Sequence, residues 1–380
     1  MKQQDQSQPY TPQNPQVYIP NDEVDFKELF KALWASKLII VLTTALFMVV
    51  STGFAFLAQE WWSSNAKVAE AQLQDISAYQ QQVIKLQPVF NIYQEDGTVL
   101  VSDELETLVD PELLFQRFVD TFNSNNNKRA FLNSNAGFKA FKTTLFVDNT
   151  EKSEKSEKSE DSERKLYVEW FNRIKASPVD KRESKSSYDV TLQATTKQSS
   201  FDLLSDYILM TKSKVHQDVF NDFQAVINGK LNELNQQKKV LETHAKSQLA
   251  VELARAKYAM NIALAAGVEK PIQTGNDKER FSIDLGSKGL QAKVQILESL
   301  KNLSVIEPRL QQINAKLDIL GNFKVDRNIE FQTFRYLENV SQPITRDKPK
   351  RVLIILFATL FGGFFSVAFV LIRFVLRKGS

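Results

Sequence analysis

The side chains that most often perform catalysis or bind metal ions are few in this sequence and lie far apart. Cysteine is absent, and the only histidines are His216 and His244. Both lie in a segment that we expect to form one helix, which would separate them by about 42 Å at about 1.5 Å per residue. Phosphate-binding sequences of the form GxxxxGK(S/T) or GxGxxG do not occur. The sequence therefore predicts a protein that is not an enzyme, with no catalytic residues, no metal site and no cofactor.

The segment that contains both histidines predicts an unusually long helix. Residues 201–266 include no proline and a single glycine, Gly229, and one continuous helix of this length would extend about 100 Å. Ser199 or Ser200 can cap its first turn, and Gly267 can adopt a left-handed conformation after its last turn. We expect a strut that projects into water or between subunits, and a kinked pair of helices within a globule is the alternative.

The middle of this helix is predominantly polar. Between residues 232 and 248 the apolar side chains form only a narrow seam: Leu234, Val240, Leu241 and Ala245. A helix that packs on a domain has a wider apolar face, so we expect this section to face solvent or a neighbouring subunit's helix and not a core within one protomer. The candidate face between subunits consists of Leu234, Leu241, Glu242 and Lys246.

Two uncharged apolar runs, residues 38–58 and 352–372, bracket most of the chain. Each would form a helix of about 31 Å, against a hydrocarbon core of about 30 Å, so both are expected to cross a membrane. Residues 25–34 have the pattern of an amphipathic helix that lies on the membrane before the first span, and a simple helical run-up to the span is the alternative. The second span has a face of small residues that permits close contact with the first span, another subunit or a membrane partner: Ala358, Gly362, Gly363 and Ser366.

These features divide the chain into seven segments and predict an α+β membrane protein. A disordered tail and amphipathic helix (1–37) precede the first span (38–58). A mixed α/β base (59–200) contains a low-complexity Glu-Lys-Ser loop (151–162), and the long helix and shorter returning helices (201–320) follow it. A last strand and linker (321–351) lead to the second span (352–372) and a short tail (373–380); the linker residues of interest are Pro343, Pro349, Lys350 and Arg351.

Several strands and short helices are expected within this base and its return. Alternating or apolar runs predict strands at residues 62–69, 166–171, 188–194 and 330–337, and a hairpin at 88–101. Helical spacing predicts helices at 113–122, 288–300 and 309–320.

Charge excludes one class of partner. The chain has 48 Lys and Arg against 45 Asp and Glu, a formal net charge of +3, which does not favour nucleic-acid binding. Basic residues flank the two sides of the spans almost equally, so charge alone does not orient the chain in the membrane. Membrane lipid is the partner that the apolar runs predict.

Five stretches resemble the Wzz-type O-antigen chain-length determinants, also called polysaccharide co-polymerases. Residues 259–271 are similar to the motif that ends the family's long helix, here with Ala259, Ile262, Ala263, Gly267 and Pro271. The sequence Leu285-Gly286-Ser287 resembles the motif that starts the return. Residues 62–68 resemble the family's first strand, 25–34 the segment before the first span, and 343–351 the proline-rich approach to the second span, although with fewer prolines than is usual.

The resemblance implies two transmembrane helices flanking a periplasmic domain, with a membrane-proximal mixed α/β base and a very long protruding helix. It implies an inner-membrane location with both termini cytoplasmic, a homo-oligomeric ring or bell, and the O-antigen polymerase and lipid-linked glycan as partners. The expected function is non-enzymatic regulation of the modal chain length of O-antigen or a related lipid-linked surface polysaccharide. A periplasmic sensor ectodomain and a transport adaptor that bridges the periplasm are the alternatives, and the short tail after the second span disfavours the sensor.

Overall fold

The computed structural model describes residues 26–94, 96–147, 157–180, 182, 187–272 and 281–378. They form two compact units: one contains the chain up to residue 61 and from residue 345 onward, and the other contains residues 62–344. The tail predicted to be disordered (1–20) and residues 151–156 of the Glu-Lys-Ser run lie outside the described residues.

The first unit consists of three helices, α1 (Phe26–Ala35), α2 (Lys37–Leu57) and α12 (Arg351–Lys378). Both α2 and α12 are long and apolar enough to cross a membrane, and they pack against each other. α12 extends beyond the predicted span because its helical hydrogen bonding continues through the basic residues that follow Ile372. The outward side chains stay uncovered, as at Phe364, which is 73% exposed. Helices that are apolar on every side are stable in lipid, where every backbone group is paired within the helix.

The second unit is built around a four-stranded antiparallel sheet in the order β4-β5-β1-β6. Its strands are β1 (Trp62–Glu70), β4 (Ile174–Pro178), β5 (Tyr188–Ala194) and β6 (Phe334–Ser341). The sheet joins the two ends of the unit, because β1 pairs with β5 on one side and with β6 on the other. Alternate residues of β1 and β5 are buried, which is the pattern of strands with one face on a core.

Two strand predictions needed correction. Residues 166–171 are not a strand but the end of helix α8 (Glu157–Arg173), whose start also lies within the predicted 151–162 loop. The buried residues of α8 are Leu166, Tyr167, Trp170 and Phe171. Their spacing suits one face of a helix, but in so short an apolar run it also resembles the alternation of a strand. The last strand begins at Phe334, four residues later than predicted, because Phe331 and Thr333 are buried in a non-strand segment before it.

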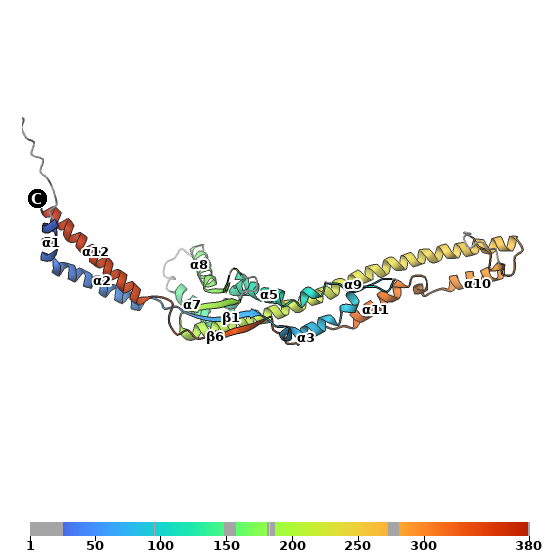
Figure 1. The fold of residues 1–380 in the computed structure, drawn as a ribbon, viewed down its shortest axis with the longest axis horizontal. Helices are drawn as coiled ribbons and strands as arrows, with labels where there is room; N and C mark the ends of the chain where they lie inside the picture. The colour runs from blue at the N-terminus through green and yellow to red at the C-terminus, as the bar shows by residue number, and fades with distance from the viewer. Residues whose placement is uncertain are drawn as a thin grey trace, which may run out of the picture. The chain divides into compact units, whose positions relative to one another are not determined.

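Shorter elements complete the second unit (Figure 1). In chain order they are α3 (Leu73–Ile84), α4 (Gln87–Phe90), the hairpin β2 (Ile92–Tyr93) and β3 (Val99–Leu100), η1 (Glu106–Leu108), α5 (Pro111–Asn123), α6 (Asn125–Ser134) and α7 (Ala136–Val147), followed after α9 by α10 (Gly286–Ser299), η2 (Leu303–Val305) and α11 (Arg309–Asn322). The three predicted helices are confirmed. The predicted hairpin is confirmed at residues 92–100, whereas residues 88–90 of the predicted range belong to helix α4.

The predicted long helix is confirmed as α9, Lys197–Ala265, with 69 residues. It begins earlier than expected, because Thr196 and not Ser199 or Ser200 is the cap: the Ser199 N–H donates to the Thr196 hydroxyl at 3.0 Å. The first half of α9 packs on β1, β5 and α5. Figure 1 shows α11 and α10 returning alongside its second half.

A cluster of aromatic rings packs α9 against other elements of the base. Tyr79 of α3 stacks on Phe331 with 4.7 Å between ring centroids, and Phe220 and Phe223 of α9 meet Tyr79 edge-on at 5.8 and 6.1 Å. Edge-on and offset pairs of this kind each contribute about 0.5–1.5 kcal/mol beyond area burial. The cluster fixes the first half of α9 to α3 and to the segment that leads into β6.

Candidate functional sites

The end of α9 is formed by hydrogen bonds that require a glycine. The Gly267 N–H donates to Leu264 O at 3.2 Å and the Val268 N–H donates to Ala263 O at 2.9 Å, while Gly267 has a φ of 69°. This pair of bonds is the Schellman motif. The predicted left-handed position of Gly267 is therefore confirmed.

The returning motif packs directly against this helix end. Gly286 has a φ of 67°, and a Cβ atom there would lie 2.6 Å from the backbone oxygen of Lys270, so the chain can pass this closely only without a side chain. The next N–H, of Ser287, donates to Val268 O at 2.9 Å. Ala259, Ala263 and Leu290 form a small core beneath the turn. The remaining motif residues lie on the surface: Ile262, Pro271 and Leu285.

The small-residue face of the second span lies against the first span. A Cβ atom on Gly362 would lie 2.7 Å from Phe47 Cβ of α2, whereas Gly363 has open space. Ser366 is buried and donates its hydroxyl proton to Gly363 O at 2.7 Å, and Ala358 is half-buried. Small residues allow this close approach of two helices.

A polar cluster that the sequence analysis did not single out joins the other ends of these helices. Glu60 lies 2.9 Å from the Arg346 guanidinium and 2.7 Å from that of Arg351. Arg351 also donates to Ala55 O at 3.0 Å and lies over the Phe56 ring at 4.3 Å. The sequence does contain a signal for this cluster. A carboxylate follows the first apolar run directly, and two arginines precede the second apolar run. Of the other linker residues, Pro343 is buried, Pro349 half-buried and Lys350 exposed.

The middle of α9 is only partly the solvent-facing section that we expected. Leu234 is 2% exposed and Leu241 is half-buried, because α11 covers this side of the helix. Leu234 therefore belongs to a core within the protomer and not to an exposed face. Glu242 is half-buried, and Lys246 is exposed. Val240, on another side, is 67% exposed.

Each histidine packs α9 against a different partner. His216 stacks on Phe331 with 4.2 Å between ring centroids, and burial lowers the pKa of His216 to about 4. His244 Nδ1 lies 3.6 Å from a carboxylate oxygen of Glu307. Among the described residues, no group of three or more His, Asp or Glu side chains could hold a metal ion.

Glu307 is a buried carboxylate between η2 and α11, within the segment that returns along α9. The Arg309 guanidinium donates to its two oxygens at 2.7 and 2.9 Å. These hydrogen bonds hold the pKa of Glu307 at about 2, below its usual value, since they favour the charged form. Glu307 thus links α9, through His244, to the turn that begins α11.

Known proteins share both the sequence pattern and the fold. Residues 22–135 match the family model of Wzz, "Chain length determinant protein". The "Chain length determinant protein" of Escherichia coli K12 is 25% identical over 94% of this chain and 94% of its own length. The "Ferric enterobactin transport protein FepE" of the same strain is 22% identical over 98% of this chain and 94% of its own.

A solved structure extends the likeness to the fold. The structure described as "full-length bacterial polysaccharide co-polymerase" matches with a TM-score of 0.60 and 24% identity, covering 93% of this chain and 99% of that one. The α+β fold with two terminal apolar helices and a single long helix is therefore shared across nearly the whole chain.

Proposed function

The chain belongs to the Wzz family of chain-length determinants, and we propose that it regulates the modal chain length of O-antigen or a related lipid-linked surface polysaccharide. The observation that carries this proposal is the fold shared with a full-length polysaccharide co-polymerase over 93% of the chain. In this role the protein is a scaffold in a bacterial inner membrane and not an enzyme. Both termini lie in the cytoplasm, and residues 62–344 form the periplasmic domain.

We propose that the scaffold acts by holding its partners at fixed positions. α9 would extend about 100 Å. The aromatic cluster fastens its first half, and the Schellman turn closes its far end, within one protomer. A rigid strut of this length can hold a growing glycan or a polymerase at a defined place in an oligomer, so that geometry biases when elongation ends. Support for a homo-oligomer comes from apolar side chains on the second unit that the protomer leaves exposed, including Leu209 and Val240 of α9 and Ile92 of the hairpin.

We propose that α12 contacts the polymerase through its aromatic side. The small-residue face is occupied by α2, whereas the exposed phenylalanines of α12 have no partner within the protomer's first unit among the described residues: Phe357, Phe361, Phe364 and Phe369. Close aromatic packing in lipid is driven by dispersion and shape. A partner helix that fits this ridge would be held against α12 in the membrane.

The length distribution of the glycan tests the function directly. Deleting the gene should replace a modal cluster of glycan lengths on a gel by an unregulated ladder, and the wild-type gene should restore the mode. The matched variant is Phe361→Ala with Phe364→Ala, which should broaden the mode while the protein remains in the membrane at its normal level. A ladder unchanged by the deletion refutes the proposal and favours the sensor or adaptor alternatives.

Topology can be tested independently, because the chain has no cysteine. A single cysteine at Asp161, an exposed position of α8, should react with a membrane-impermeant maleimide in cells with a permeabilised outer membrane. A cysteine at Lys27 should react only after the inner membrane is opened. The reverse pattern would contradict the proposed orientation whatever the glycan ladder shows.

A further inference from the structure

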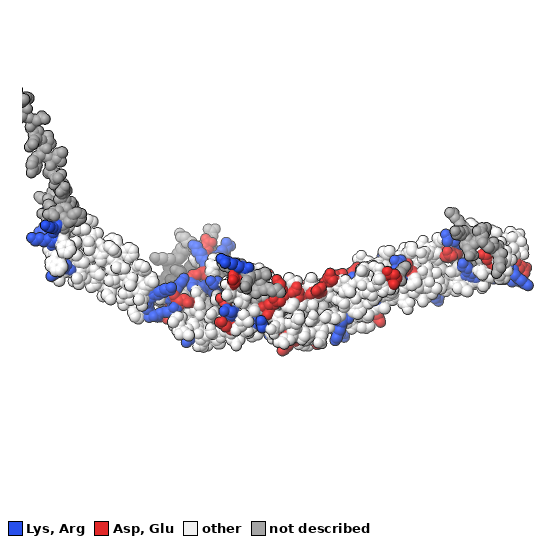
Figure 2. Space-filling view, in the orientation of Figure 1, with Lys and Arg blue, Asp and Glu red and all other residues white. Residues whose placement is uncertain are grey.

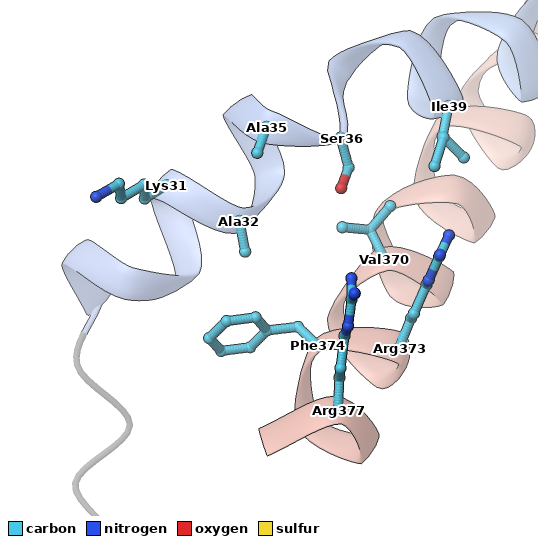
Figure 3. Close-up of a pocket in the computed structure, with 9 residues that line it drawn as sticks. All are labelled: Lys31, Ala32, Ala35, Ser36, Ile39, Val370, Arg373, Phe374 and Arg377. Atoms are coloured by element: carbon cyan, nitrogen blue, oxygen red, sulfur yellow. The ribbon is translucent and has the colours of Figure 1, made fainter. Parts of the chain in front are cut away.

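A cavity of about 770 Å³ lies between α1, the start of α2 and the last turns of α12. Its larger apolar lining residues are Ile39, Val370 and Phe374, and its rim carries Lys31, Arg373 and Arg377. Figure 3 shows the two arginines extending from α12 towards the junction of α1 and α2, with Lys31 at the outer edge. The volume is in the range of sites that bind small molecules.

Small residues on α1 and at its junction with α2 create this space. Ala32, Ala35 and Ser36 face the cavity where longer side chains would fill it. On its other side α1 exposes Phe30 and Trp34, whose rings stack at 6.5 Å, and Lys37 lies over Trp34 at 5.4 Å. An amphipathic helix with exposed aromatic residues lies at the membrane interface. The cavity therefore opens at the depth of lipid head groups.

Among the described residues, the charges at the rim have no ion-pair partner. Arg373 and Arg377 are one helical turn apart, a spacing at which like charges destabilise a helix. No carboxylate lines the cavity among the described side chains, and the structure gives neither arginine an ion pair with any described residue. The C-terminal end of a helix favours cations, but this accounts for the sign of the charge and not for a cavity with an apolar floor beside it. Figure 2 shows Lys and Arg gathered at this end of the spans.

We propose that this cavity binds the phosphate of an anionic phospholipid from the cytoplasmic leaflet. The guanidinium groups of Arg373 and Arg377 would hold the phosphate oxygens, since planar paired donors match phosphate geometry. The glycerol and the first acyl carbons would lie over Ile39 and Val370. Basic pockets between membrane helices on the cytoplasmic side recognise such head groups. The bound lipid fastens α1 to α12. This site depends on membrane insertion and not on the glycan function.

Binding can be measured by native mass spectrometry of the full-length protein in neutral detergent. Phosphatidylglycerol and phosphatidylcholine are titrated separately, and phosphatidylglycerol should bind at least about tenfold more tightly. Replacing both arginines (Arg373→Gln with Arg377→Gln) should abolish this preference. Ala32→Leu, which fills the cavity and keeps both charges, should weaken phosphatidylglycerol to the level of phosphatidylcholine.

The control removes equal charge at the opposite ends of the spans. Lys348→Gln with Lys350→Gln changes two exposed lysines and should leave the preference intact. Circular dichroism and oligomer mass should match wild type for every variant compared. An equal loss in the control variant, or an unchanged preference in Ala32→Leu, overturns the proposal in favour of non-specific surface charge. Displacement of phosphatidylglycerol by millimolar inorganic phosphate overturns the lipid assignment in favour of a soluble anion.

Discussion

The first half of α9, from Lys197 to Lys230, buries twelve residues against the base, whereas the second half buries five. The buried residues of the first half include Tyr207, Phe220 and Phe223, while three of those in the second half are alanines near its end. One helix is thus held in two ways. Large side chains in the core of the base hold its first half, whereas the returning helices α10 and α11 cover its second half. The difference predicts that substitutions will unfold the base but only loosen the tip.

Truncation in the base should have the largest effect. Phe223 is fully buried and meets both Tyr79 and Phe323 edge-on. Phe223→Ala should lower the free energy of unfolding by about 4 kcal/mol, through lost transfer energy and the cavity left behind. Urea denaturation of the full-length protein in detergent, followed by circular dichroism, measures this loss. The matched change in the far half, Val240→Ala, should cost less than about 0.5 kcal/mol; equal losses would contradict the comparison.

A strained substitution beside the far end of α9 should cost less stability than truncation in the base, and its effect should stay local. Gly286→Ala forces a side chain into a left-handed backbone within contact distance of Lys270 O, at a cost of about 2–3 kcal/mol. Hydrogen exchange should speed up at residues 259–268, and the base strands should keep their protection. The control is Gly229→Ala, where nothing lies within 4 Å of the added Cβ and helix stability should rise by about 0.5–1 kcal/mol. Loss of protection throughout the base in Gly286→Ala would show that the two halves unfold together.

The stability of the base should depend on pH through His216. Burial lowers the pKa of His216 to about 4, so the unfolded chain binds its proton more readily than the folded one. Stability from neutral His216 is complete above pH 6.5 and is lost as the pH falls towards 4, by about 2 kcal/mol. His216→Gln should flatten this part of the stability profile. A profile that is unchanged in His216→Gln would remove His216 as the cause.

The smallest effect on stability is expected at the polar middle of α9. Charge reversal by Glu242→Lys or Lys246→Glu should change the free energy of unfolding by less than about 0.5 kcal/mol, because Lys246 is exposed, Glu242 is half-buried and neither forms an ion pair with a described residue. If neighbouring protomers meet here, as we propose, the glycan mode or the oligomer mass should change. The neutral variant Lys246→Gln should have a smaller effect and serves as the control. Unfolding in either single variant would be inconsistent with a solvent-facing middle.

The sequence alone was sufficient for the elements whose signals are local. Two uncharged apolar runs predict the spans, the absence of proline predicts α9, and Gly267 predicts where α9 ends, because each depends on solvation or backbone sterics within one segment. Residues 166–171 were misassigned because a short apolar run satisfies both helix and strand spacing.

Only the tertiary structure decided which surfaces meet. The seam at Leu234 is covered because α11 returns along it, and Gly362 approaches Phe47 because α12 packs on α2. Glu60 becomes an ion-pair centre only when residues nearly 300 positions later, Arg346 and Arg351, return to it. The cavity beneath α1 likewise combines the two ends of the chain. Such contacts depend on long-range packing, in which partners far apart in sequence determine burial, and no periodicity within a segment encodes them.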